Sequence, residues 1–157
     1  MNGDKWILLV EDNVNDADLA TRALTTDEAH VEVVVARDGA EALDRLHSRG
    51  EFHLSAREKP ILVLLDLKMP RVDGFEVLEE IKADPHLKQI PVVIFTSSRE
   101  ERDVVRCYQL GANAYVVKPA GFKQLFETVQ EILRFWININ EPSPTTAPRT
   151  AAATIAA

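Results

Sequence analysis

Cysteine is nearly absent from this sequence. The single Cys107 excludes an internal disulfide and a zinc site. Basic residues are also in deficit, because 18 lysines and arginines face 25 aspartates and glutamates, giving a formal net charge of −7. That balance argues against nucleic acid binding, since contacts to phosphate backbones need clustered lysine and arginine. No apolar run approaches the roughly 20 residues that span a bilayer, and the first residues lack the features of a signal peptide. We therefore expect a cytoplasmic protein that binds neither nucleic acid nor membrane.

Short apolar runs alternate with helical patterns along the 157 residues, a length typical of one domain. The runs are predicted to be buried strands at 6–10, 31–35, 61–65, 91–96 and 114–117. Helices are predicted at about 13–26, 38–50, 73–85, 98–111 and 122–136. Such alternation predicts an α/β fold with a doubly wound parallel sheet, right-handed crossovers and helices on both faces.

Helix boundaries also carry local signals. Three predicted helices begin with a capping residue followed three positions later by glutamate: Asp38 with Glu41, Asp73 with Glu76, and Ser98 with Glu101. The last helix has apolar residues at offsets of three and four: Phe122, Leu125, Phe126, Val129, Ile132, Leu133 and Trp136. This spacing predicts a wide buried stripe. The polar segment 51–59 is predicted to be a surface loop.

Reactive or metal-binding side chains follow four of the five predicted strands. They are Glu11 and Asp12, Asp66, Thr96, and Lys118. For any single position, a polar residue that begins a loop is the simpler interpretation. Taken together, three carboxylates at neighbouring strand ends repel one another unless a cation shares them, and oxygen ligands suit Mg²⁺. A hydroxyl, an ammonium and a divalent ion stabilise a transferring phosphoryl group, and the remaining carboxylate can be its nucleophile.

This ordered set resembles the receiver domains of two-component response regulators, over about residues 5–135. The matching motifs are Glu11-Asp12, Asp66, Met69-Pro70, Asp73-Gly74, Thr96-Ser97 and Lys118-Pro119. The resemblance implies a flavodoxin-like fold of five strands in the order 2-1-3-4-5 with five helices. It also implies a role in phosphorelay signalling.

The resemblance assigns roles to the acidic residues. Asp66 would accept a phosphoryl group from a phosphohistidine of a sensor kinase. Glu11 and Asp12 would hold Mg²⁺, directly or through water, together with Asp66 and the backbone carbonyl of Lys68. Mn²⁺ or Ca²⁺ could take the place of Mg²⁺ in a crystal.

The same resemblance assigns Thr96 and Lys118 to the phosphoryl oxygens. It implies a cis peptide bond before Pro119, and we expect a trans bond there to displace the Lys118 ammonium.

Three further positions follow from the resemblance. Tyr115 would move inward as Thr96 is drawn to the phosphoryl group; the alternative is a half-buried strand tyrosine without a switching role. Lys68 and Ser98 would lie beside the phosphoryl group and tune its hydrolysis.

The output is expected to be a protein contact, because only about 20 residues follow the last helix, too few for a DNA-binding domain. We expect a receiver domain over 1–140 and a mobile tail, rich in Pro, Thr and Ala, over 141–157. The loop at 51–59, the segment 84–91 and the helix ending at Phe135-Trp136 resemble single-domain regulators that partner phytochrome-type kinases.

That finer resemblance implies a homodimer through the last helix and its extension. Phe135, Trp136 and Ile139 are the candidate contacts, because Phe135 and Ile139 point away from the apolar stripe. Phe135 could instead cover the edge of its own domain, and residues 137–140 alternate in polarity and could form an extended arm.

The leading hypothesis is a signalling protein that phosphorylates itself at Asp66, loses the group slowly and turns over no small molecule. A first alternative is an adaptor of the same fold that acts without phosphorylation. A second is an aspartyl-phosphate phosphohydrolase of the haloacid-dehalogenase type, although such enzymes have an aspartate where this chain has Lys68. Nucleotide binding is disfavoured, because no glycine-rich phosphate loop follows any predicted strand.

Overall fold

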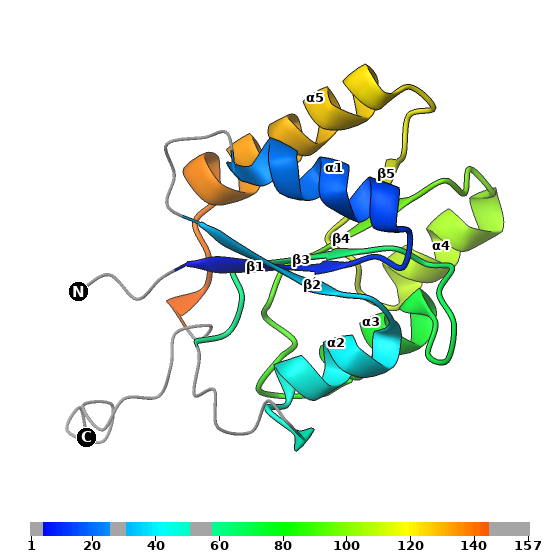
Figure 1. Cartoon of the computed structure of the whole chain (residues 1–157). Helices are drawn as coiled ribbons and strands as arrows, with labels where there is room; N and C mark the ends of the chain where they lie inside the picture. Colours follow the sequence, from blue (N-terminus) through cyan, green and yellow to red (C-terminus); the bar gives the residue numbers. More distant parts are fainter. Residues whose placement is uncertain (1–4, 26–30, 51–57, 145–157) are drawn as a thin grey trace.

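Five parallel strands form the centre of the computed structural model, which describes residues 5–25, 31–50 and 58–144 (Figure 1). The strands are β1 (Trp6–Val10), β2 (Glu32–Ala36), β3 (Leu62–Leu65), β4 (Val92–Thr96) and β5 (Ala114–Val117). Their order in the sheet is β2-β1-β3-β4-β5, and every neighbouring pair is parallel. The expected fold and strand order are confirmed, with β2, β3 and β4 each beginning one residue later than predicted.

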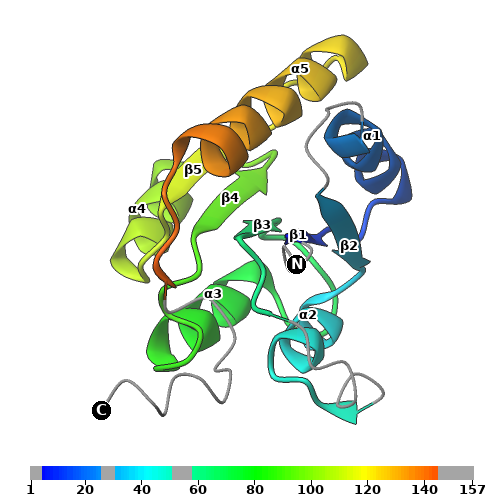
Figure 2. The same cartoon turned by 90° about the vertical axis from the view of Figure 1, so that its left-hand side faces the viewer.

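Helices connect the strands and cover both faces of the sheet. They are α1 (Val14–Thr25), α2 (Gly39–Leu46), α3 (Gly74–Ala83), α4 (Glu101–Gln109) and α5 (Phe122–Leu133), and α5 continues into a π-helical turn, η2 (Arg134–Ile139). Figure 1 shows α1 and α5 on one side of the sheet and α2 and α3 on the other. Figure 2 shows α4 beside β5. Among the residues that the structure describes, no helix is long and apolar enough to cross a membrane.

The continuous apolar runs form strands because both faces of the sheet are covered. Every residue of β1, β3 and β4 is buried, whereas β2 and β5, at the two edges, are mostly half-buried. Side chains along β1 alternate between two cores: Leu8 and Val10 face α2, α3 and α4, and Ile7 and Leu9 face α1 and α5. Full burial of one such side chain stabilises the fold by roughly 1.5–3 kcal/mol.

Two of the three predicted helix caps are confirmed. The carboxylate of Asp38 accepts a hydrogen bond from the Glu41 N–H at 2.8 Å at the start of α2. The carboxylate of Asp73 accepts one from the Glu76 N–H at 3.0 Å at the start of α3. The third expectation is wrong, because α4 begins at Glu101 with no side-chain cap. The Ser98 hydroxyl lies outside this helix and donates instead to the Asp103 carboxylate.

The predicted stripe on α5 is wrong for Phe122. Leu125, Val129, Ile132 and Leu133 are buried, but 73% of Phe122 is exposed. The first turn of α5 faces a surface hollow whose lining from α1 is mostly polar, with Leu19 beside Asn15, Asp18 and Arg22, so it has little apolar surface to pack against. The predicted loop at 51–59 and tail at 141–157 lie mostly outside the described residues.

Candidate functional site

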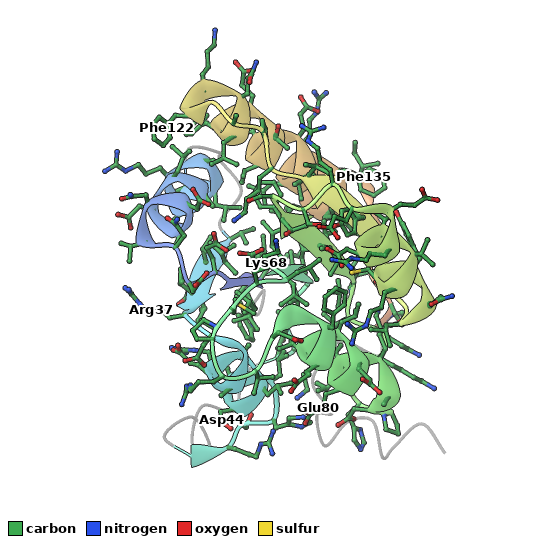
Figure 3. The ribbon with its side chains drawn as sticks, turned by 90° about the vertical axis from the view of Figure 1, so that its right-hand side faces the viewer. Arg37, Asp44, Lys68, Glu80, Phe122 and Phe135 are labelled. Atoms are coloured by element: carbon green, nitrogen blue, oxygen red, sulfur yellow. The ribbon has the colours of Figure 1, made fainter. Side chains whose placement is uncertain are left out.

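The carboxyl ends of the strands meet at one edge of the sheet, where backbone hydrogen bonds continue past the strands. The Asp66 N–H donates to the Val10 carbonyl at 3.1 Å, and the Lys118 N–H donates to the Thr96 carbonyl at 2.7 Å. These bonds fix the backbone of the residues that carry the polar side chains. Figure 3 looks onto this edge, with Lys68 near its centre.

Three carboxylates converge at this edge. One oxygen from each of Glu11, Asp12 and Asp66 lies within 4.8 Å of the other two. Glu11 and Asp66 are buried, with 4% and 8% of the residue exposed, whereas Asp12 is exposed. A set of oxygen donors with one side open to solvent suits a hard divalent cation such as Mg²⁺, which retains several water ligands. The residues present therefore fit the ion that the sequence predicts.

Lys118 contributes the positive charge of the site. Its Nζ lies 2.6 Å from Glu11, 3.0 Å from Asp16 and 3.5 Å from Oδ2 of Asp66. Only 9% of the lysine side chain is exposed, so the ion pairs are poorly screened by solvent. The ammonium thus lies between the acidic cluster and the first turn of α1.

Burial and crowding shift the protonation of this cluster. Burial raises the pKa of Glu11, and the hydrogen bond and charge of Asp66 raise it further against the opposing effect of Lys118. Burial alone would lower the pKa of Lys118, but the charges of Asp66 and Glu11 and the bonds to Glu11 and Asp16 outweigh it, so the pKa lies above its usual value. The buried acids therefore need positive charge to remain ionised together.

The predicted cis bond before Pro119 is wrong. No peptide bond among residues 5–25, 31–50 and 58–144 is cis, so the Lys118–Pro119 bond takes the trans form that most such bonds adopt. With this trans bond, the Lys118 Nζ still forms an ion pair with Asp66 at 3.5 Å, although its contacts with Glu11 and Asp16 are shorter.

The loop between β3 and α3 carries Lys68 and is held at both ends by contacts between backbones. A side chain at Gly74 would collide with the carbonyl oxygen of Asp66, and one at Gly39 would collide with the carbonyl oxygen of Val72. The loop also contains Arg71 in the left-handed region, at φ 67°. The Lys68 side chain is exposed.

A second group of polar contacts surrounds Thr96. Its buried hydroxyl accepts a hydrogen bond from the Ser98 N–H at 3.3 Å, and the Ser98 hydroxyl donates to Asp103 at 2.6 Å. The Tyr115 hydroxyl donates to the Ser98 carbonyl at 3.0 Å. Burial raises the pKa of Tyr115, because the opposing bond to Ser98 is weaker than the combined effect of burial and the nearby acids. Tyr115 is half-buried and packs against the core beneath α3 and α4.

The candidate dimer residues lie away from this site, at the end of α5. Phe135 and Ile139 are 45% and 64% exposed, whereas Trp136 is half-buried and packs against the core beneath α1 and α5. The Phe135 and Trp136 rings meet edge to face, with centroids 5.0 Å apart. Figure 3 shows Phe135 on the outer side of the domain.

Asp16 is the residue at this site that sequence reasoning missed. An acid in the first turn of a helix has an ordinary explanation, since it complements the helix dipole. Its position could have indicated this role, because Asp16 comes four residues after Asp12 on a helix that begins at the carboxyl ends of the strands. Because α1 starts directly above the edge, its first turn projects a carboxylate toward Lys118.

The family model described as the response regulator receiver domain matches residues 7–130. The chain belongs to this family. It is 46% identical to the response regulator Rcp1 of Synechocystis sp. strain PCC 6803, over 87% of this chain and 91% of that protein. The crystal structure of the phosphorylated cyanobacterial phytochrome response regulator RcpA shares 45% identity and a TM-score of 0.85, covering 88% of this chain and 98% of that one. The bacteriophytochrome response regulator AtBRR shares 53% identity and a TM-score of 0.70, covering 88% and 99%.

Membership of the receiver family settles the class of the protein. Receiver domains bind a divalent metal ion. The crystal structure of the Mn²⁺-bound form of Rcp1 is 44% identical to this chain, with a TM-score of 0.84, and covers 88% of this chain and 99% of that one. The divalent ion expected from the sequence is confirmed, and the acidic cluster of Glu11, Asp12 and Asp66 is suited to hold it. A receiver domain also implies a sensor kinase as its partner.

Proposed function

We propose that Asp66 accepts a phosphoryl group, and that this reaction switches the protein between two signalling states. The observation that carries the proposal is the position of its carboxylate. The Asp66 carboxylate contributes an oxygen to the acidic cluster, and its Oδ2 lies 3.5 Å from the Lys118 ammonium. An incoming phosphoryl group would therefore meet positive charge on both sides of its acceptor.

The reaction is an in-line displacement at phosphorus. An Asp66 carboxylate oxygen forms the new P–O bond, the P–N bond to a kinase histidine breaks, and its electron pair stays on the imidazole nitrogen. Glu11, Asp12, Asp66 and the Lys68 carbonyl would hold Mg²⁺, which when bound would supply positive charge to the phosphoryl oxygens. Lys118 and the Thr96 hydroxyl contribute the remaining contacts.

The contacts around Thr96 support a switch. Its hydroxyl accepts the Ser98 N–H and would donate its own proton to a phosphoryl group on Asp66, and the Ser98 carbonyl in turn accepts the Tyr115 hydroxyl. A shift of Thr96 would therefore reach Tyr115 through the backbone of Ser98. The Ser98 hydroxyl is bonded to Asp103, so Ser98 would tune the lifetime of the phosphoryl group through its backbone contact with Thr96. Lys68 tunes it from the opposite loop.

We infer a phytochrome-type sensor kinase as the donor, since RcpA and AtBRR, which are 45% and 53% identical to this chain, are phytochrome response regulators. The kinase draws its phosphoryl group from ATP, which places the exchange in the cytoplasm. The net charge of −7 disfavours nucleic acid as the target, so the output is a protein contact. The phosphoryl group is lost by slow autodephosphorylation, without turnover of a small molecule.

We propose a receiver unit over residues 1–140, with 141–157 as a tail whose residues 145–157 lie outside the described part of the chain. The receiver unit would form a homodimer through Phe135, Trp136 and Ile139, because exposed apolar side chains at the end of α5 favour association. Sedimentation should show that Phe135→Ser lowers the dimer fraction. Phe122→Ser is the matched control, since Phe122 is also exposed but lies at the other end of α5. Equal loss with both variants would contradict this interface.

The central test is label transfer from a phosphorylated sensor kinase in the presence of Mg²⁺. The wild type and Asp18→Asn, which removes an exposed acid of α1, should take up label, and Asp66→Asn should not. Retention of label by Asp66→Asn would refute the proposed acceptor. A partner that binds equally with and without beryllofluoride would favour the adaptor alternative, and steady turnover of a small phosphate ester would favour the phosphohydrolase.

A further inference from the structure

Asp16 holds the ammonium that the phosphoryl group would need. Its carboxylate lies 3.0 Å from the Lys118 Nζ, closer than the Asp66 oxygen at 3.5 Å. An ammonium has three N–H donors, and its two shortest contacts here go to Glu11 and Asp16. The lysine is therefore drawn toward α1 and away from the proposed acceptor.

The place of Asp16 in the first turn of α1 suits the helix dipole, but this does not account for its contact with Lys118. Its carboxylate is not among the three that converge as possible metal ligands in the described residues, and 27% of its side chain is exposed. The side chain of Asn13, which accepts the Asp16 N–H at 3.1 Å, provides the cap at the start of α1. Helix capping therefore does not explain why the Asp16 carboxylate reaches across to β5.

We propose that Asp16 is a positioning residue that competes with the phosphoryl group on Asp66 for the ammonium of Lys118. It thereby sets how readily the phosphorylated state forms. The inference rests on the proposed role of Asp66 and adds a regulatory contact to that site.

Two physical effects act in the same direction. To contact a phosphoryl oxygen, the ammonium must turn toward Asp66 and give up part of its charge-assisted bond to Asp16. The Asp16 carboxylate also places a negative charge near an incoming anionic group, and partial burial limits its screening. Glu11 differs from Asp16 because it belongs to the acidic cluster and keeps a role when the ion binds.

The test measures the affinity for beryllofluoride, an analogue of the phosphoryl group, by calorimetry in saturating Mg²⁺. Asp16→Asn keeps the size of the side chain but removes its charge. We expect it to bind beryllofluoride about threefold to tenfold more tightly than the wild type, the range given by the difference between a charge-assisted and a neutral hydrogen bond. Phosphorylation by acetyl phosphate should be faster by a similar factor.

Two variants control for charge and for structure. Asp18→Asn removes the same charge from the exposed side of the same helix and should leave the affinity close to that of the wild type. Asp16→Glu keeps a carboxylate and should restore most of the competition. A purely structural role would lower the thermal stability of Asp16→Asn without tightening its anion binding, whereas competition tightens anion binding while the Mg²⁺ affinity stays nearly constant.

The possible results separate this inference from the proposed function. If the wild type binds beryllofluoride but Asp16→Asn binds no more tightly than Asp18→Asn, the competition is refuted and the role of Asp66 stands. Weaker binding by Asp16→Asn would refute it equally, since Asp16 would then assist the phosphoryl group. If the wild type does not bind beryllofluoride with Mg²⁺, both fail. Should Asp16→Asn fold poorly, Asp16→Ser removes the same carboxylate and takes its place in the comparison.

Discussion

Lys82, in the last turn of α3, joins three separate parts of the fold through one ammonium. Its Nζ donates to the carbonyls of Lys88 and Ile90 at 3.0 and 2.9 Å, and to the Asn113 side-chain oxygen at 3.0 Å. The Asn113 oxygen also accepts from the Val92 N–H at 2.9 Å, where β4 begins. This network connects the end of α3 to the starts of β4 and β5, at the end of the sheet opposite the acidic cluster.

Substitution of Lys82 by methionine should isolate the contribution of the ammonium. Methionine keeps an unbranched apolar stem, which packs against Gly111, but it removes all three donors. A hydrogen bond from a charged group contributes about 1.5–3 kcal/mol, and relief from desolvating the ammonium offsets part of the loss. We expect the free energy of unfolding to fall by about 2–3 kcal/mol, which corresponds to roughly 4–12 °C in Tm for a domain of this size.

Urea denaturation followed by circular dichroism measures this change. Lys88→Met makes the same chemical substitution at an exposed side chain in the same region and should alter stability by less than about 0.5 kcal/mol. If Lys82→Met is as stable as Lys88→Met, the three hydrogen bonds contribute nothing net, and the argument from this network is wrong. A lowered denaturant slope without a lower midpoint would instead indicate a changed unfolded state.

Three further outcomes are expected. Mg²⁺ at a hundred times its dissociation constant should stabilise the wild type by about 2.7 kcal/mol in urea titrations, and Asp12→Asn should lose most of that gain. Burial raises the pKa of the Cys107 thiol to about 11. The unfolded chain therefore releases this proton first, and stability should fall by about 1 kcal/mol per pH unit between pH 9 and 11, a slope that Cys107→Ala lacks. Asp103→Ala removes the acceptor of the Ser98 hydroxyl and should destabilise the fold by about 1–3 kcal/mol, whereas the adjacent first-turn substitution Glu101→Ala should change little; equal melting curves for the two would contradict this.

Much of the architecture could be predicted because the relevant signals are local. Apolar runs such as 61–65 identify buried strands, and the spacing of Asp38 from Glu41 identifies a helix start. The convergence of polar residues follows from topology, since parallel strands end at one edge. The strand order itself came from the family resemblance, because periodicity does not distinguish one sheet order from another.

The failures share a different cause, since each depends on a neighbour that sequence spacing does not reveal. The spacing of Ser98 from Glu101 matches a cap, but the hydroxyl found a stronger acceptor in Asp103. Phe122 has helical spacing, but the surface opposite it is mostly polar. Asp16 was missed because its partner, Lys118, lies 102 residues further along the chain.

The loop that follows Asp66 is held by close backbone contacts, because Gly39 lies against the Val72 carbonyl and Gly74 lies against the Asp66 carbonyl. A chimera that exchanges this loop between receivers must therefore carry both glycines with it, or the Lys68 carbonyl will shift relative to the acidic cluster. In a library that randomises positions 39 and 74, selection for a folded protein is expected to return glycine at both. Redesign of the ion's coordination should instead begin at Asp12, the exposed member of the cluster.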